Sequence, residues 1–319
     1  MFAYAARRII YTIPLLIIGT FIVFFLVSIA GDPLARFATC TTCDQSAYDR
    51  IIDLYDLDEP IPQRYLSWLG GALTGDLGTS PRFGNQPVAE ILPERIWNTA
   101  LIAVPAMLLI ALLSVVLGVY SAVRQYSFGD HLFTGLSFVA IAMPVFVTAL
   151  LLQIFWGVWW PEWTGTKPFF IAGKHTGSPL ELLQSLVLPI TALVLVILAA
   201  ESRYQRASML EVLNSDYVRT ARAKGVPKRT VIYHHALRNA LIPMVTIWAL
   251  DFAFLLGGSV VTETVFAWPG LGPMLYDGIF AFDVDLVMAI VMFFAVLVII
   301  FNLVADLLYG VLDPRIRLD

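Results

Sequence analysis

The sequence predicts an all-α integral membrane protein that crosses the membrane with six helices. Of its 319 residues, 59% are hydrophobic and only 14% are charged, and the mean hydropathy is +0.78. A soluble domain is nearer to a quarter charged, so composition excludes a water-soluble globule. The net charge of -4 gives no basic excess for nucleic acid, and two cysteines are too few for a disulfide-stapled scaffold.

Six stretches almost free of charge define the expected membrane spans. Each is long enough for about 20 helical residues, which is what a bilayer requires. They are residues 9–31, 96–123, 132–161, 182–200, 239–262 and 286–305, and Asp251 is the one charged residue inside them. The first stretch exceeds the apolar region of a signal peptide, so we expect a retained helix.

The positions of Lys and Arg predict that both termini are cytoplasmic. With that orientation most of the 20 basic residues are internal, and eight of them lie between Arg203 and Arg238. Residues 32–95 then form a large, acidic external loop. The chain divides into residues 1–95, a first helix with this loop, and residues 96–319, a five-helix core that includes a basic internal loop at 201–238.

Cys40 and Cys43 form a C-x-x-C pair in the external loop. A disulfide is permitted outside the cytoplasm, whereas a metal site would need further Cys or His residues, which this loop lacks. We therefore predict a small structural disulfide, with free thiols as the alternative, and no metal site.

The internal loop carries the most informative pattern. Tyr217, Val218 and Ala221 share one helical face, Gly225 ends that helix, and Pro227 can begin the next. We therefore expect a helix–turn–helix along the membrane surface. A basic loop that only satisfies topology and binds anionic lipid is the alternative, but it leaves the two amphipathic segments without a reason.

Several motifs in this order resemble the first permease subunit of dipeptide, oligopeptide and nickel ABC importers, and the likeness covers nearly the whole chain. The internal loop contributes the runs DYVRTARAKG, from Asp216 to Gly225, and HALRNALIP, from His235 to Pro243. Further runs are Arg7-Arg8 with the first span and GDP at 31–33, GDLG at 75–78, GGSVVTETVFAWPGLG at 257–272 and LDPRIR at 312–317.

The sequence departs from related permeases at two points. Sugar-type permeases begin the loop motif with Glu-Ala-Ala, where Arg219-Thr220-Ala221 stand here. The cysteine pair lies outside the family pattern.

The resemblance implies a type I ABC permease core in a bacterial plasma (inner) membrane, with the internal loop as the site that couples to ATPases. The implied coupling residues are Asp216, Tyr217, Arg219, Thr220, Ala221, Arg222, Lys224 and Gly225. The implied partners are a homologous second permease subunit, two cytoplasmic ATPases and an extracytoplasmic substrate-binding protein, within membrane lipid and without nucleic acid.

The chain itself is not expected to be an enzyme or to hold a cofactor. A P-loop needs a Lys followed by Ser or Thr, and none of the four lysines is so followed. ATP and Mg are therefore expected on the partner subunits. Short peptides are the expected cargo, and nickel or another small solute is the alternative.

Three residues are candidates for the translocation pathway. Asp251 is a mid-span carboxylate, either facing the pathway to meet a peptide amino terminus or pairing with a neighbouring helix. Glu263 and Trp268 lie in a turn-rich external segment that either contacts cargo or caps the helices.

Two other function classes fit the sequence less well. A secondary transporter or channel working alone would favour inverted repeats or runs of ionisable residues, and neither is evident. An intramembrane enzyme would need a motif such as HExxH or GxSxG, and the sequence has neither.

Overall fold

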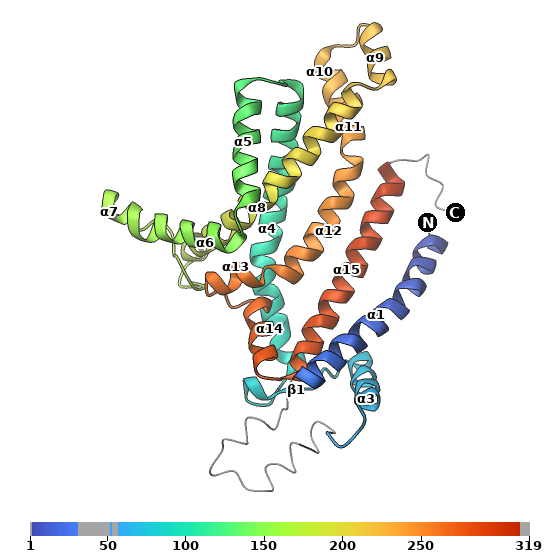
Figure 1. Ribbon diagram of the computed structural model, residues 1–319, viewed down its shortest axis with the longest axis vertical. Helices are drawn as coiled ribbons and strands as arrows, with labels where there is room; N and C mark the ends of the chain where they lie inside the picture. Colours follow the sequence, from blue (N-terminus) through green and yellow to red (C-terminus); the bar gives the residue numbers. More distant parts are fainter. Residues whose placement is uncertain (1, 31–51, 53–56, 313–319) are drawn as a thin grey trace.

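The computed structural model describes residues 2–30, 52 and 57–312, and these form a bundle of long helices (Figure 1). A two-residue hairpin pairs β1 (Thr79–Ser80) with β2 (Gln86–Pro87) in antiparallel fashion, around a short 3-10 turn at Pro81–Phe83. The α-helices are α1 (Phe2–Ala30), α3 (Ile61–Thr74), α4 (Val88–Val123), α5 (Phe128–Ala142), α6 (Val145–Ile154), α7 (Trp160–Thr164), α8 (Pro179–Leu213), α9 (Asp216–Ala223), α10 (Lys228–Thr230), α11 (Leu237–Ala240), α12 (Ile242–Gly258), α13 (Val260–Val265), α14 (Leu271–Phe280) and α15 (Val284–Leu312). Two π-helical segments complete the set, η3 (Phe155–Trp159) and η4 (Val231–Ala236).

Six helical stretches among the described residues are long and apolar enough to cross a membrane, which confirms the predicted number of spans. They are Ile10–Ala30, Val88–Val123, Val145–Thr164, Pro179–Leu213, Ile242–Val265 and Val284–Leu308. A shorter apolar helix, Phe128–Ala142, accompanies them. The chain is therefore an integral, multi-pass membrane protein.

The third predicted span, residues 132–161, is wrong as a single helix. α5 ends at Ala142, and Met143 adopts an extended conformation with φ -91° and ψ 121° before Pro144. A residue that precedes proline is pushed out of the helical region, so Pro144 ends the helix instead of bending it. The chain restarts as α6, η3 and α7, which run sideways from the bundle (Figure 1).

Two predicted helix boundaries are also wrong, because charge does not end a helix. α4 begins at Val88 and runs unbroken through residues 95 and 96. α8 continues past residue 200 to Leu213, so the first part of the predicted internal loop is helical. The buried residues of α8 extend as far as Met209, so the helix stays packed over this length.

The core centres on α4, α8 and α12. The largest buried cluster joins Ile102 and Ile110 of α4, Leu193 of α8, Leu255 of α12 and the ring of Trp268. α1 lies beside α15 (Figure 1), and an ion pair of 3.1 Å joins Arg8 to Asp306 across them. α3, which lies between α1 and α4 in the chain, packs against α1.

α3 begins directly after Pro60. It carries Tyr65, whose hydroxyl lies 2.8 Å from that of Thr20 on α1.

Gly118 of α4 sets how closely α4 and α8 approach. A Cβ at this position would lie 2.6 Å from the Gln205 Cβ and 3.0 Å from the Arg206 backbone nitrogen. Gly118→Val is therefore expected to push the helices apart and destabilise the fold by about 1–3 kcal/mol. The matched control is Gly135→Val in α5, where no heavy atom lies within 4 Å. Thermal unfolding in detergent gives the melting temperature of each variant. Equal melting temperatures for Gly118→Val and Gly135→Val would contradict the close approach of α4 and α8 at Gly118.

Candidate functional site

The candidate site is the helix–turn–helix between α8 and α12, at the end of the bundle where α9 and α10 lie (Figure 1). α9 presents two faces. Val218 is fully buried against the rest of the loop, whereas its neighbour Tyr217 is 47% exposed. α9 is therefore amphipathic, but the predicted face is wrong in one residue, because Tyr217 is exposed and does not share the buried face of Val218.

A left-handed residue makes the turn after α9. Gly225 has φ +76°, the region that favours glycine because a Cβ would strain the backbone. Its backbone nitrogen donates to the Arg222 carbonyl oxygen at 3.0 Å, and the Val226 nitrogen donates to that of Ala221 at 3.2 Å. These bonds satisfy carbonyls that the end of α9 would otherwise leave free. Pro227 then begins α10, as predicted.

The return segment α10–η4–α11 is anchored to α8. Ala236 and Ala240 are fully buried and pack with Met209 of α8. The Ser208 hydroxyl of α8 donates to the Ala240 carbonyl oxygen at 2.9 Å. The helix–turn–helix is therefore attached to α8 by packing as well as by chain connectivity.

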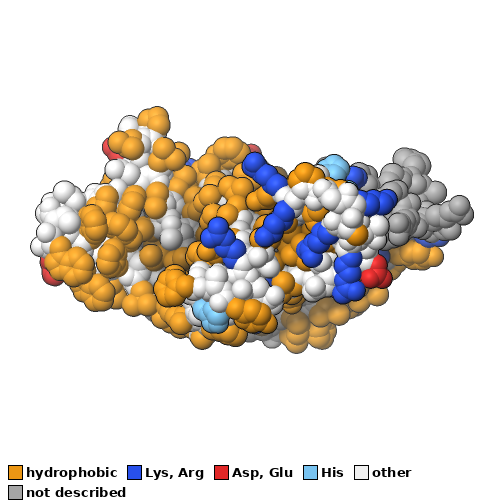
Figure 2. Space-filling view, turned by 90° about the horizontal axis from the view of Figure 1, so that it is seen from above, with side chains coloured by type: hydrophobic (Ala, Val, Ile, Leu, Met, Phe, Trp, Pro, Cys, Tyr) orange, Lys and Arg blue, Asp and Glu red, His pale blue; other side chains and the backbone are white. Residues whose placement is uncertain are grey.

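The structure brings the predicted coupling residues together on one exposed surface. Figure 2, seen from the α9 end, shows Lys and Arg side chains gathered there among hydrophobic ones. Ala221 is half-buried and the other predicted coupling residues are exposed, namely Asp216, Tyr217, Arg219, Thr220, Arg222, Lys224 and Gly225. We call this set the α9 surface. Within it, Arg219 and Asp216 form an exposed ion pair of 3.7 Å.

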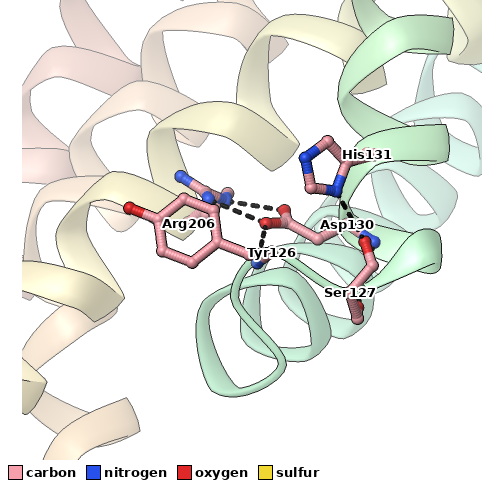
Figure 3. A network of polar contacts seen from close by, with 5 residues as sticks. All are labelled: Tyr126, Ser127, Asp130, His131 and Arg206. Atoms are coloured by element: carbon pink, nitrogen blue, oxygen red, sulfur yellow. Dashed lines mark hydrogen bonds and ion pairs between the residues drawn. The ribbon is translucent and has the colours of Figure 1, made fainter.

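A buried ion pair behind the site was missed in the sequence. Arg206 of α8 donates from Nε and Nη2 to the two carboxylate oxygens of Asp130, each at 2.9 Å (Figure 3). The Tyr126 backbone nitrogen donates to the same carboxylate at 2.9 Å. Asp130 is only 3% exposed, and its backbone nitrogen donates to the Ser127 hydroxyl. This clamp fixes the start of α5 to α8, close to where the α9 surface is attached.

The pathway candidates Glu263 and Trp268 make contacts inside the subunit. Glu263 is fully buried and accepts hydrogen bonds from the Gly272 nitrogen at 2.7 Å and the Ser259 hydroxyl at 2.8 Å. Trp268 is 1% exposed and donates from Nε1 to the Asn98 carbonyl oxygen at 2.8 Å. These contacts favour the capping alternative over direct contact with cargo.

Glu263→Ala tests that alternative. The substitution leaves a buried amide and a buried hydroxyl without an acceptor, so we expect a loss of about 1–3 kcal/mol in stability. Thermal unfolding measures the effect against Glu162→Ala, an exposed glutamate on α7. Unchanged stability together with altered cargo uptake would instead assign Glu263 to the pathway.

The third candidate, Asp251, lies on α12, one turn after Trp248. Trp248 donates from Nε1 to a carboxylate oxygen of the buried Glu201 on α8 at 2.7 Å. Asp251 itself is half-buried, and both alternatives for its role stay predictions.

Two further predictions concern metal sites and the cysteine pair. No group of three or more His, Cys, Asp or Glu side chains suited to a metal ion occurs in the described part of the chain. Cys40 and Cys43 lie outside the described residues, so their disulfide stays a prediction.

Comparison with known proteins finds relatives that match this chain over nearly its full length. The chain is 38% identical over 324 residues to the oligopeptide transport system permease protein AppB of Bacillus subtilis, covering 99% of this chain and 100% of the relative. It is 36% identical to the oligopeptide permease protein OppB of Mycobacterium tuberculosis, with 100% of both chains covered. It is 34% identical to the dipeptide permease protein DppB of Escherichia coli K12, with 99% of both covered.

Two family profiles match in succession. Residues 1–100 match the N-terminal region of binding-protein-dependent transport system membrane components. Residues 114–318 match the binding-protein-dependent transport system inner membrane component itself, and this match contains the whole α9 surface. The chain therefore belongs to the family of inner membrane components of binding-protein-dependent transport systems, the permease subunits of ABC importers.

Proposed function

We propose that this chain forms half of the translocation pathway of an ATP-driven importer of short peptides. The observation that carries the proposal is the exposed α9 surface, held rigidly at the end of α8, in a chain whose full-length relatives are named oligopeptide and dipeptide permeases. A surface of this kind lets a partner move the membrane helices from outside the bilayer.

The proposed orientation places the α9 surface and both termini in the cytoplasm. Figure 1 supports this arrangement, because α1 begins and α15 ends toward the half of the bundle that carries α9. The segment from α1 to α4, which includes α3 and the β1–β2 hairpin, is then external. Residues 1–95 then form the first helix with its external loop, and residues 96–319 form the five-helix core of a type I permease in the bacterial plasma membrane.

The proposed partners follow from what the chain lacks. It has no P-loop, so two ATPase subunits would bind ATP and Mg and contact the α9 surface. A homologous second permease would supply the other half of the pathway, and an external substrate-binding protein would deliver the peptide. The pathway would lie between the two permeases, in keeping with the internal contacts of Glu263 and Trp268.

The mechanism we propose is rigid-body alternating access. Closure of the ATPase pair would displace α9, and its attachment through Ser208 and Met209 would pass the movement to α8. α8 spans Pro179–Leu213 without a break, so one helix carries the displacement from the α9 surface across the membrane. The Arg206–Asp130 clamp would carry α5 with it.

Affinity purification from native membranes in mild detergent tests the assignment. We expect a C-terminally tagged chain to recover a second permease and ATPase subunits, identified by mass spectrometry. Reconstitution of that complex should then show ATP-dependent uptake of a labelled dipeptide, and uptake of nickel or another solute in its place would reassign the cargo. Recovery of an intact chain without partners would contradict the importer and favour a secondary transporter or channel.

A further inference from the structure

Two basic side chains are connected through one buried amide, at the end of the bundle that the proposed orientation makes external. That end carries the start of α4 and the turn at residues 266–270, which follows α13. Lys174 Nζ donates to Asn98 Oδ1 at 2.7 Å, and Asn98 Nδ2 donates to the Pro269 carbonyl oxygen at 2.8 Å. Arg95 Nη1 donates to the same carbonyl oxygen at 3.2 Å. Three hydrogen bonds therefore link the two cations.

The surroundings hold this pair in a fixed position. Asn98 is fully buried, and its carbonyl oxygen accepts a 2.8 Å hydrogen bond from Trp268 Nε1. Lys174 lies in the segment that joins α7 to α8, where the Gly173 nitrogen donates to the Phe266 carbonyl oxygen at 2.7 Å. The backbone before Lys174 and the side chain that receives its ammonium group are therefore both anchored. A ligand that binds there does not have to order the site first, which favours binding.

The two positive charges lack a counter-charge within the described part of the chain. No ion pair found there includes Lys174 or Arg95. Both residues are half-buried, so water solvates their charges only in part. Arg95 also lies near the ring of Phe83, with its guanidinium carbon 5.9 Å from the centroid. The oxygens of Asn98 and Pro269 accept hydrogen bonds but carry no net charge, so the positive charge of the pair stays unbalanced.

Unused hydrogen-bond donors complete the description of the pair. Lys174 and Arg95 each give one hydrogen bond to the protein, whereas an ammonium or guanidinium group has several N–H donors. Unbalanced positive charge and free donors together fit an anion with oxygen acceptors. Carboxylates form short, charge-assisted hydrogen bonds with both kinds of cation.

We propose that Lys174 and Arg95 bind the C-terminal carboxylate of the incoming peptide. This inference rests on the proposed import of short peptides and names a contact for that cargo. Every unmodified peptide ends in a carboxylate whatever its sequence, so one pair of cations serves many different peptides.

An acidic side chain of the substrate-binding protein is the other source of a carboxylate, and the position of the pair favours the peptide. Arg95 lies about 10 Å along α4 from its start at Val88, at 1.5 Å per residue. Lys174 is half-buried and bonds to a fully buried residue, whereas Lys167 in the same segment is exposed. A folded partner reaches exposed groups such as Lys167 first, and a free peptide end reaches half-buried groups more easily.

Saturation-transfer NMR tests the carboxylate contact without requiring transport. The probes are dialanine and dialanine amide, which differ only at the C-terminal carboxylate, added to the purified complete transporter without binding protein. We expect dialanine to give a several-fold stronger signal than its amide with wild type and with Lys167→Gln. With Lys174→Gln, which removes the charge but keeps an N–H donor, both probes should give equal, weak signals. Equal signals from the two probes in wild type, or an undiminished preference for dialanine in Lys174→Gln, would overturn the proposal.

Uptake by proteoliposomes separates the peptide from the binding protein as the source of the carboxylate. With peptide-loaded binding protein in saturating amount, dialanine uptake should fall several-fold in Lys174→Gln and recover in Lys174→Arg, which restores the charge. The affinity of the empty binding protein for the transporter should be the same in both variants. Loss of that affinity in Lys174→Gln would overturn the proposal and assign the cations to the binding protein. Failure of the proposed function would appear differently, as absent ATP-driven peptide uptake in wild type with the NMR result intact.

Discussion

Replacing Gly225 with valine should abolish transport while leaving the subunit inserted and folded. The backbone at Gly225 has φ +76°, and a β-branched residue in that region costs about 1–3 kcal/mol. No heavy atom lies within 4 Å of an added Cβ, so the strain is confined to the turn and spares the packed core. A cost of this size reduces the population of the turn by about 5-fold to 150-fold, and with it the correct presentation of α9. Peptide uptake by membrane vesicles measures the loss.

Gly225→Asn is the matched control for that experiment. Asparagine tolerates the left-handed region, so this variant should retain most of the uptake. Both variants should melt at nearly the wild-type temperature. Wild-type uptake by Gly225→Val, with the protein present at normal levels, would refute a coupling role for the turn.

Replacing Asp130 with alanine should produce a large loss of stability in the half of the bundle that carries α9. The substitution leaves the Arg206 guanidinium, whose side chain is only 26% exposed, without its carboxylate. Breaking a buried ion pair in this way costs about 3 kcal/mol, and the Tyr126 amide loses its acceptor as well. Thermal unfolding of the purified subunit measures the effect, and uptake should fall because α5 is no longer tied to α8.

Asp277→Ala provides the comparison for Asp130→Ala. Arg82 and Asp277 also form an ion pair, at 3.4 Å, but their side chains are 49% and 42% exposed. Surface pairs contribute about 0–1 kcal/mol, so Asp277→Ala should scarcely change the melting temperature. The double variant Asp130→Leu with Arg206→Met removes both buried charges and should recover part of the lost stability. Equal effects of Asp130→Ala and Asp277→Ala would contradict the clamp.

Local chemistry made the number of spans and the helix–turn–helix predictable from the sequence. Long uncharged stretches have few alternatives to membrane helices, and six were found. Gly225 and Pro227 mark the turn because one favours positive φ and the other can begin a helix. Helical periodicity indicated that α9 is amphipathic, but it wrongly placed the exposed Tyr217 on the face of the buried Val218.

Tertiary contacts were harder to predict, because they join residues far apart in the chain. Asp130 and Arg206 are separated by 76 positions and were treated as charges flanking spans. Glu201 was taken as the first residue of a loop, although α8 continues past it with the carboxyl buried. The end of α5 was missed because residues 132–161 carry no charge, and a proline inside such a stretch can either bend a helix or end it.

Site-specific photo-cross-linking from position 217 tests the central claim most directly, namely that α9 is the contact for an ATPase. A photoreactive residue in place of Tyr217, which is 47% exposed, would be compared with one in place of Leu136 on α5, which is 56% exposed and outside the α9 surface. The account predicts an ATPase adduct from position 217 in native membranes and none from position 136. Absence of an ATPase adduct from position 217, in a protein that is inserted and active in uptake, would contradict it.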